Sequence, residues 1–438
     1  MRKLLTIAAL HGLLLMTACS DGGNSGASTT ANGTPLAMTP ASTAPGATAP
    51  TAPNVVPLVI DSGPNKATSL RPFITVTLCA PGDPTNCQTI DHIMVDTGSS
   101  GLHIASSVLG NKLKQALKPL ADPKINGNVL TLCEQYVTSF NWGSLVSADV
   151  KIGGETASAV PTQLQDDPSF TKVPTDCSDG HGSQSNSDPA LDGTNGLIGA
   201  SLNAVDGGSY YSCPAAGCAG TEISTTVATP SVSPQTKFAV DNNGVILDLP
   251  AVPVPGATTL TGTMTFGIGT QTNNQLQGVA AKVYPILANP LGNALLKTTF
   301  SGHDYSYTFI DSGSPYYSFN APDVALLPQC PSNLASYGGG FYCPSSAVAL
   351  SAVLTGNDGT VSVPMAFSIG NAEQILSTNN AALNGLGQVS FDGGALNVFD
   401  WPLQFFYGRR MYFSVQDKRS TPGPDGKPVG NGFYAFKS

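Results

Sequence analysis

The sequence predicts an all-β protein built from two similar halves. Only 11% of its 438 residues are Asp, Glu, Lys or Arg, whereas Gly (48) and Pro (34) are abundant. This composition favours short strands joined by turns over long charged helices. A chain of this length is too long for one small core. Each half also contains a strand–turn–strand segment with an aspartate at its turn, at Asp96 and at Asp311.

The first 19 residues are typical of an export signal. A basic start, Met1-Arg2-Lys3, precedes an apolar run from Leu4 to Met16 that is too short to span a bilayer. The segment Met16–Cys19 resembles the lipobox of bacterial lipoproteins, although Met16 stands where Leu is usual. The resemblance implies an acylated Cys19 and a membrane attachment in the cell envelope. Because Ser20 and not Asp follows Cys19, it implies the outer membrane or the periplasmic face more than the inner membrane. An ordinary cleaved signal with a chance cysteine is the alternative.

Residues 20–54 predict a flexible tether. They are rich in Ser, Thr, Ala, Pro and Gly, contain no Lys or Arg, and have Asp21 as their one acid. Such a segment cannot bury a core. We therefore expect two β domains at about residues 55–250 and 251–438, joined near Leu249–Gly256.

Eight cysteines remain after Cys19, and an even number in an exported chain predicts four disulfides. Proximity along the chain suggests the pairs Cys79–Cys87, Cys213–Cys218 and Cys330–Cys343, which leaves Cys133–Cys177. A zinc site is the alternative, but the sequence has no CxxC pair and its five histidines are scattered. We expect neither a metal nor a cofactor.

An Asp-Ser/Thr-Gly tripeptide occurs three times, at Asp61, Asp96 and Asp311. The segment before Asp96 alternates apolar and polar residues, turns at Pro81–Pro84 and returns to Val95, as a hairpin does. Apolar residues also surround Asp311 in "YSYTFIDSGSPYYSF". Asp61 is instead followed by Pro-Asn-Lys and reads as a turn at a strand end.

Weaker features also occur in both halves. Leucines after Asp96 recur at helical spacing, at Leu109, Leu113 and Leu117. A strand that ends in glycine follows later in each half, within Ala148–Ala157 and Met365–Gln374. The structural alternative is a generic β-sandwich whose turns match by coincidence.

Two facing carboxylates have a chemistry that one lacks. Like charges at hydrogen-bond distance cannot both ionise, so the pair holds one proton between its members. The ionised member can take a proton from a water, and the protonated member can polarise a carbonyl. Asp96 and Asp311 are therefore the candidate catalytic residues for hydrolysis without a covalent intermediate.

The residues after each aspartate occur in matching pairs: Thr97 with Ser312, Gly98 with Gly313, and Ser99 with Ser314. The first pair has short hydroxyls that can bond the backbone of the opposite loop. The glycines lack a Cβ and let the two loops approach. The serines can donate to the carboxylate oxygens.

The sequence resembles the pepsin-like aspartic peptidases. "VDTGSSGLHI" looks like their first active-site motif, "IDSGS" like their second, and Asn195–Gly199 like the strand that crosses under the first loop. The segment 134–154 sits where the family has its flap hairpin, with Tyr136 or Trp142 as its aromatic residue. The resemblance covers about residues 55–416, and it implies a bilobal fold with a central cleft.

Three departures from this family stand out. Val137 follows Tyr136 where glycine is expected, Asp400 stands where the second crossing strand would have its glycine, and Pro315 removes a backbone donor near the site. The chain also resembles a family of uncharacterised bacterial lipoproteins with the same VDTGSSGL motif and a "FDW" and "FFYGR" ending. That resemblance implies no activity.

The leading functional expectation is a membrane-anchored aspartic-type endopeptidase that acts on peptides or proteins. A non-catalytic envelope-binding protein on the same scaffold is the alternative, and a purely structural envelope protein is a third possibility. Because both motifs lie in one chain, we expect a monomer. The formal charge of −9 argues against a nucleic-acid partner. The sequence has no G-x-S-x-G elbow, and we expect surface or loop roles for His92, His103, His181 and His303.

Overall fold

The computed structural model describes residues 52–136, 139–179, 188–220, 224–227, 230–286, 296–321, 326–331, 340–390, 397–416, 418 and 420–437. Among the described residues, strands make up 45% and helices 9%, which confirms the all-β prediction. Cys19 and most of the expected tether lie outside the described residues. Within the described part of the chain, no helix has the length and apolar character needed to cross a membrane.

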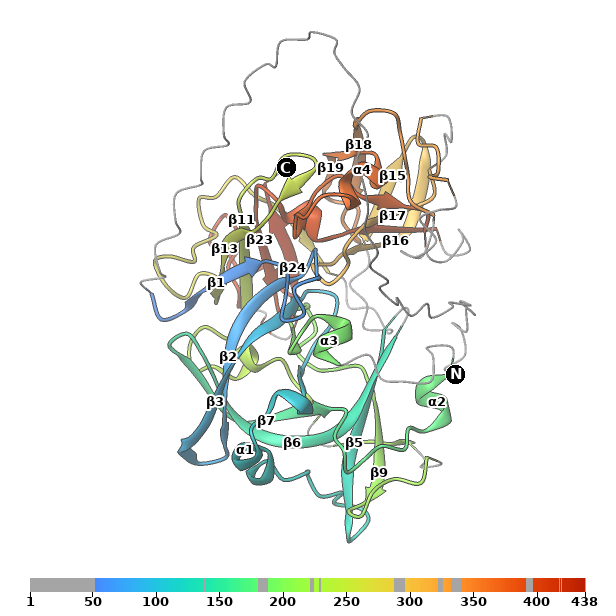
Figure 1. Cartoon of the computed structure of the whole chain (residues 1–438). Helices are drawn as coiled ribbons and strands as arrows, with labels where there is room; N and C mark the ends of the chain where they lie inside the picture. Colours follow the sequence, from blue (N-terminus) through green and yellow to red (C-terminus); the bar gives the residue numbers. More distant parts are fainter. Residues whose placement is uncertain are drawn as a thin grey trace, which may run out of the picture.

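Most strands of the N-terminal half lie together in the lower part of Figure 1. Their bounds are β2 (Pro72–Ala80), β3 (Asp83–Asp96), β4 (Leu102–Ala105), β5 (Asn128–Gln135), β6 (Phe140–Ile152), β7 (Glu155–Gln165), β8 (Gly196–Gly199), β9 (Ser209–Pro214) and β10 (Ser224–Thr225). The hairpin expected before Asp96 is β2 and β3. The last four residues of β3 are all buried, so this strand delivers Asp96 from inside the core.

The strands of the C-terminal half and its approach are β11 (Gly244–Leu249), β12 (Gly256–Ala257), β13 (Leu260–Phe266), β14 (Lys282–Pro285), β15 (Leu296–Phe300), β16 (His303–Ile310), β17 (Tyr317–Ser318), β18 (Val348–Thr355), β19 (Ser362–Ile369), β20 (Ala382–Leu383), β21 (Gly387–Gln388), β22 (Val398–Trp401), β23 (Arg409–Ser414) and β24 (Phe433–Phe436). Seven of them form one sheet in the order β19-β18-β15-β16-β22-β17-β21, and β12 pairs with β20.

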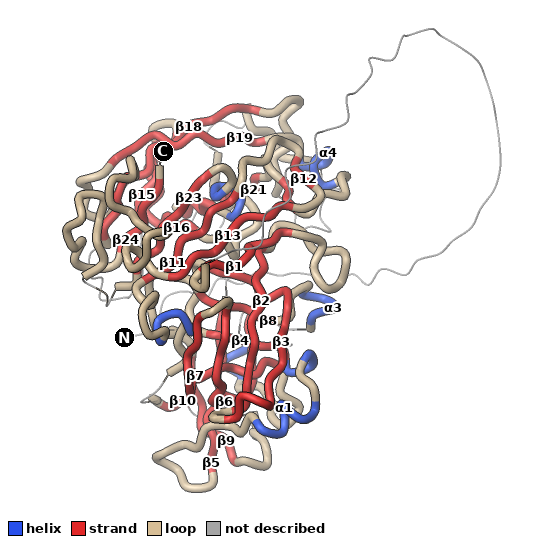
Figure 2. The backbone as a smooth tube through the Cα atoms, turned by 90° about the vertical axis from the view of Figure 1, so that its left-hand side faces the viewer, coloured by secondary structure: helices blue, strands red, loops and turns tan. Residues whose placement is uncertain are grey.

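One large sheet joins the two halves. It has 15 strands in the order β10-β9-β5-β6-β7-β4-β8-β3-β2-β1-β13-β11-β23-β24-β14. Its first strand in the chain, β1 (Val55–Ile60), pairs along its whole length with β13, and β11 pairs with β13 and β23 (Figure 2). This sheet contains strands from before and after residue 250, so it links the two halves. The boundary expected at that residue stays a prediction.

The helices of the described chain are short. They are α1 (Asn111–Ala116), α2 (Thr175–Ser178), α3 (Pro189–Asp192) and α4 (Ala372–Leu376). The leucines at helical spacing lie in and around α1, and all three side chains are buried in the main apolar core. The short turn of helix thus forms because one of its faces packs inward.

The same three-strand arrangement occurs around both aspartates. β3 runs parallel to β8, which pairs antiparallel with β4. In the other half β16 runs parallel to β22, which pairs antiparallel with β17. Each aspartate therefore lies at or just after the end of a strand that is held on one side by a short crossing strand.

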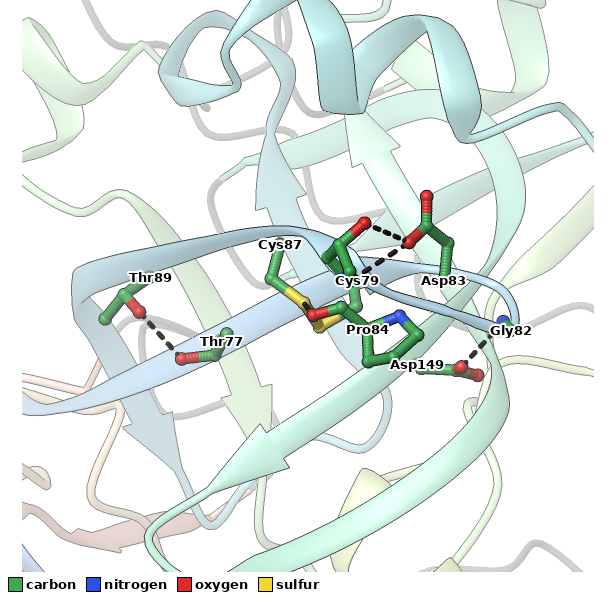
Figure 3. The surroundings of a disulfide bond; sticks show 9 residues. Thr77, Cys79, Gly82, Asp83, Pro84, Cys87, Thr89 and Asp149 are labelled. Atoms are coloured by element: carbon green, nitrogen blue, oxygen red, sulfur yellow. Dashed lines mark hydrogen bonds between the residues drawn. A yellow bond between two sulfur atoms is a disulfide. The ribbon is translucent and has the colours of Figure 1, made fainter.

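The four disulfides of the described chain are the pairs suggested by chain proximity: Cys79–Cys87, Cys133–Cys177, Cys213–Cys218 and Cys330–Cys343. The first one joins β2 to β3 near the tip of their hairpin (Figure 3). The same tip is held to β6, because the backbone N–H of Gly82 donates to the carboxylate of Asp149 at 2.8 Å. The Cys133–Cys177 bond ties β5 to α2.

Candidate active site

Asp96 lies at the end of β3, and its side chain is held by the loop that follows. The backbone N–H of Gly98 donates to Asp96 Oδ1 at 2.7 Å, and the Ser99 hydroxyl donates to Oδ2 at 2.7 Å. Only 6% of Asp96 is exposed. Both carboxylate oxygens are thus fixed by donors from the next three residues, as in a tight turn.

Asp311 repeats this geometry just beyond β16. Gly313 N–H donates to Asp311 Oδ1 at 2.7 Å, and the Ser314 hydroxyl donates to Oδ2 at 3.0 Å. The roles expected for Ser99 and Ser314 correspond to these contacts. The two loops therefore present their carboxyl groups in equivalent ways.

Thr97 and Ser312 interlock the two loops. The Thr97 N–H donates to Ser312 Oγ at 3.0 Å, and the Ser312 N–H donates to Thr97 Oγ1 at 2.9 Å. Each hydroxyl then donates across to the opposite strand, Thr97 to the carbonyl of Ile310 at 3.1 Å and Ser312 to that of Val95 at 2.7 Å. Both side chains are buried. In this reciprocal set each hydroxyl both donates and accepts a hydrogen bond, which fixes the loops relative to each other.

The two glycines let the carboxyl groups approach. A Cβ placed on Gly98 would lie 2.6 Å from Asp311 Oδ2, and one on Gly313 would lie 2.6 Å from Asp96 Oδ1. Any side chain at either position would therefore collide with the opposite carboxyl group. The structure thus brings Asp96 and Asp311 together across the interlocked loops.

Burial raises the pKa of Asp311 well above its usual range, and the charges of Asp96 and Asp400 raise it further. A hydrogen bond to Asp96 acts in the same direction, whereas the Gly313 N–H acts against it. Two carboxyl groups in this relation do not both ionise readily, because like charges at short distance repel each other.

Asp400 is a third carboxyl group at this site. It lies on β22, is 6% exposed, and its Oδ1 has no hydrogen-bond partner among the described residues. Burial raises the pKa of Asp400 to about 7, with the charge of Asp96 adding to this and the Ser314 hydroxyl opposing it. Asp400 does not take the place of the crossing-strand glycine that the sequence predicts there, as the strand register shows. Asp400 pairs as Leu197 does in the first half, two residues before Gly199.

Tyr136 and Trp142 occupy different sides of the hairpin formed by β5 and β6. Tyr136 packs against Phe73, Met94 and Leu197. Its pKa is raised well above the usual range by burial, and further by the charges of Glu134 and Asp96, which places it on the side of the dyad. Val137 lies outside the described residues.

Trp142 does not face the dyad. It is 2% exposed and lies in an apolar cluster around the Cys133–Cys177 disulfide. Its indole N–H donates to the carbonyl of Phe170 at 2.6 Å. Of the two aromatic residues considered for the flap, only Tyr136 lies near Asp96.

His103 is buried, contrary to the surface or loop role expected for it. Its Nδ1 lies 2.7 Å from Gln163 Oε1 and its Nε2 lies 3.0 Å from the carbonyl of Ser100. The amide of Gln163 is oriented by donating to the carbonyl of Leu132 at 2.8 Å. Nε2 also lies 3.5 Å from Asp206 Oδ2, and both of these side chains are fully buried. His103 thus supports the first active-site loop from below.

Glu134 extends this network toward the dyad. Burial raises the pKa of Glu134 well above its usual range, followed by the charge of Asp206, a hydrogen bond to Asp206 and the charge of Asp96. These residues come from β4, β5 and the loop before β9 and form no local motif. Sequence reasoning had no signal for them, since only the pairing of distant strands brings them together.

Asp61 is engaged locally, as a turn residue is. The Gly63 N–H donates to its Oδ1 at 2.8 Å, and the same oxygen lies 3.3 Å from His92 Nε2. In the described residues no group of His, Cys, Asp and Glu has an arrangement that could hold a metal ion. Two surface cavities of about 550 and 300 Å³ lie in the C-terminal half near Asn320 and Ala321, and neither is lined by Asp96 or Asp311.

The chain matches one protein family over most of its length. The family described as "Protein of unknown function (DUF3443)" matches residues 50–436. The chain belongs to the DUF3443 family. The match covers every described strand, so the paired aspartates lie inside the family domain. A search of curated proteins finds no match.

Proposed function

We propose that this protein is an aspartic-type endopeptidase with a bilobal, pepsin-like architecture. The observation that carries the proposal is the interlock of Thr97 with Ser312, which sets the buried Asp96 and the partly buried Asp311 against each other, each beside the glycine of the opposite loop. An aspartate that only formed a turn would not need a second aspartate opposite it. The matching three-strand arrangement around each aspartate supports the pseudo-symmetry of the architecture.

The proposed reaction is general acid–base hydrolysis. Asp96 and Asp311 together carry one proton and bind a water between them. The ionised carboxylate removes a proton from this water as its oxygen attacks the peptide carbonyl, and the protonated carboxyl donates its proton to the carbonyl oxygen. The tetrahedral intermediate then collapses: the carboxyl group that took the proton from water donates it to the amide nitrogen, the C–N bond breaks, and a hydroxyl of the intermediate returns its proton to the other aspartate. No covalent bond to the protein forms.

Tyr136 has the position of a substrate-covering residue in this proposal. Because its raised pKa keeps the phenol protonated, its hydroxyl remains a hydrogen-bond donor throughout the range in which the dyad works. The apolar cluster of Phe73, Met94 and Leu197 beneath it would form one wall of the substrate site.

The proposed setting is the bacterial cell envelope. The lipobox-like segment that ends at Cys19 supports an acylated protein at the outer membrane or the periplasmic face. The four disulfides agree with an exported chain, because disulfides persist in oxidising compartments. In this proposal the protein is a monomer, since one chain supplies both aspartates.

A non-catalytic binding protein on the same scaffold is the second candidate. Asp400 favours it, because a third buried carboxyl group beside the dyad changes the charge on which acid–base chemistry depends. Folds are often reused without their chemistry.

Cleavage of a denatured protein substrate from acid to neutral pH tests the proposal. The chain lacking residues 1–19 should cleave it, Asp96→Asn should abolish cleavage, and a pepstatin-type inhibitor should bind. Asp61→Asn is the matched control, because it alters the same tripeptide outside the site and should leave cleavage intact. If wild type and Asp96→Asn are equally inactive and the inhibitor does not bind, the peptidase proposal is wrong.

A further inference from the structure

Asp400 and Ser318 form a polar pair with unused hydrogen-bonding capacity. They are direct partners across the antiparallel strands β22 and β17, so their side chains project on the same face and lie side by side. Asp400 is 6% exposed and Ser318 is 2% exposed. Yet Asp400 Oδ1 and Ser318 Oγ have no hydrogen-bond partner in the described structure. Buried polar atoms are rarely left unpaired, and such a pair suggests that the partner is a ligand.

This pair lies beside the dyad. β22 runs parallel to β16, the strand that ends next to Asp311. The charge of Asp400 acts on Asp311, and that of Asp96 acts on Asp400. The Ser314 hydroxyl donates to Asp311 Oδ2 at 3.0 Å and also lowers the pKa of Asp400, so it is shared between the two acids. Asp400 Oδ1 still has no hydrogen-bond partner in the described structure.

No positive group of the described chain forms an ion pair with Asp400. Arg409, on the strand that follows β22, donates to the carbonyls of Phe405 and Ala366 and lies 4.2 Å above the Phe405 ring. Its guanidinium is thus engaged elsewhere. Three carboxyl groups lie close together, which creates a negative field that favours a cation.

The equivalent pair in the first half is Leu197 and His103, which are direct strand partners as Asp400 and Ser318 are. Leu197 packs with Phe73, Met94 and Tyr136, and both ring nitrogens of His103 have hydrogen-bond partners. The first half therefore has an apolar side chain and a fully bonded polar one where the second half has an acid and a hydroxyl with unused hydrogen-bonding capacity. The two halves would select different substrate side chains.

We propose that Asp400 and Ser318 form an acidic subsite that accepts a Lys or Arg side chain of the substrate next to the scissile bond. This inference rests on the proposed peptidase function. The ammonium or guanidinium donates to Asp400 Oδ1, and the Ser318 hydroxyl accepts a second hydrogen bond from it. Such a cation compensates the buried charge that the protein leaves unpaired.

The preference for a basic side chain should depend on pH. Because the pKa of Asp400 is raised to about 7, the carboxyl group is mostly protonated in acid and charged above neutral pH. The titratable groups around it are Asp96 and Asp311 on the two loops. Burial also raises the pKa of Tyr317, on the adjoining β17, and of Tyr434, on β24 near Asp311, and keeps both neutral. The selectivity for a cation should therefore increase as pH rises through about 7.

Matched peptides that differ only by Lys or norleucine beside the scissile bond test the subsite. At neutral pH, wild type should prefer Lys by about tenfold or more in kcat/KM, the scale of one charge-assisted hydrogen bond. Asp400→Asn should still cleave the norleucine peptide but lose the preference. Asp425→Asn, which removes an exposed acid of the same half, should keep it.

A binding measurement separates the two proposals. Pepstatin-type inhibitors that carry Lys or norleucine at the equivalent positions are titrated into wild type and Asp400→Asn by calorimetry. Tighter binding of the Lys form to wild type alone supports the subsite. Cleavage and inhibitor binding without any preference for Lys overturn the subsite and leave the peptidase proposal intact. Failure of both cleavage and inhibitor binding overturns the peptidase proposal and the subsite with it.

Discussion

Gly98 and Gly313 show at the residue scale how closely the dyad is assembled. A methyl group on either would lie 2.6 Å from an oxygen of the opposite aspartate, well inside van der Waals contact. Relief of this clash requires the two carboxyl groups to move apart. The site therefore depends on the absence of two side chains as much as on the presence of two acids.

Gly98→Ala should accordingly reduce kcat/KM by about 100-fold, since a displacement near 1 Å at a reacting group has effects of that size. Kinetics on a peptide substrate measure this. Gly207→Ala is the control, because a Cβ there meets no atom within 4 Å. Full activity in Gly98→Ala would contradict the close approach of the two carboxyl groups.

Asp400 should make stability depend on pH. Its folded pKa of about 7 lies above the ordinary value of 3.8, so the folded state binds the proton more tightly than the unfolded state. Its contribution to stability is therefore complete below pH 3.8 and is lost as pH rises through about 7.

Asp400→Asn removes this dependence. The melting temperature of Asp400→Asn minus that of wild type should be larger at neutral pH than in acid. The pKa shift corresponds to a change of up to roughly 4 kcal/mol in the difference between their free energies of unfolding. Thermal unfolding of both proteins across this range measures the effect. Parallel curves would show that Asp400 does not titrate with a raised pKa.

The sequence predicted those residues whose roles follow from a local sequence pattern. Thr97 and Ser312 could be paired with their partners because each follows an aspartate in a matching segment. His103, Glu134 and Asp206 could not, because their network depends on which distant strands lie side by side. A single histidine within an apolar strand carries no sign of its partners.

At the element scale, the two aromatic residues of the β5–β6 hairpin should differ in role, with Tyr136 affecting activity and Trp142 affecting stability. Tyr136→Ala removes the residue near Asp96 and should lower kcat/KM by about tenfold or more. Trp142→Phe removes the hydrogen bond to Phe170 and should lower stability by about 1 kcal/mol while kcat/KM is kept. Kinetics and urea unfolding of both variants measure this. The reverse pattern would assign the flap role to Trp142.

The disulfides should differ in their contribution according to the loops that they close. Cys133–Cys177 spans 44 residues and Cys213–Cys218 spans 5. Replacing the first pair by serine should cost about 4 kcal/mol, and replacing the second should cost clearly less, because longer loops lose more entropy on closure. Melting temperatures of the two double variants test the order, and equal losses would contradict it.

Strand patterns predicted the elements around each aspartate but not every partner. The hairpin of β2 and β3 is visible from apolar alternation and a Pro-Gly turn. The pairing of β1 with β13 is not, because the two strands are about 200 residues apart and neither contains a signal for the other. Register is a property of the assembled sheet. For the same reason the sequence alone matches Asp400 with the glycine and not with Leu197.

At the scale of the whole molecule, the two aspartates come from different sheets. Asp96 ends a strand of the 15-stranded sheet, Asp311 follows β16 of the seven-stranded sheet, and the interlocked loops join the two. β1 and β11 connect strands of both halves, and Thr97 and Ser312 lock the loops where the halves meet. Such a framework restricts the motion of one aspartate relative to the other. It suits a dyad that must keep a fixed geometry while a substrate enters and leaves.

The central claim is that Asp96 and Asp311 act as one unit, and kcat/KM of Asp96→Asn, Asp311→Asn and the double variant tests it most directly. Residues that act as a unit are strongly non-additive. Each single variant should lose about 10⁴-fold or more in activity, and the double variant should lose no more than either one. Near-wild-type activity in either single variant would contradict the dyad.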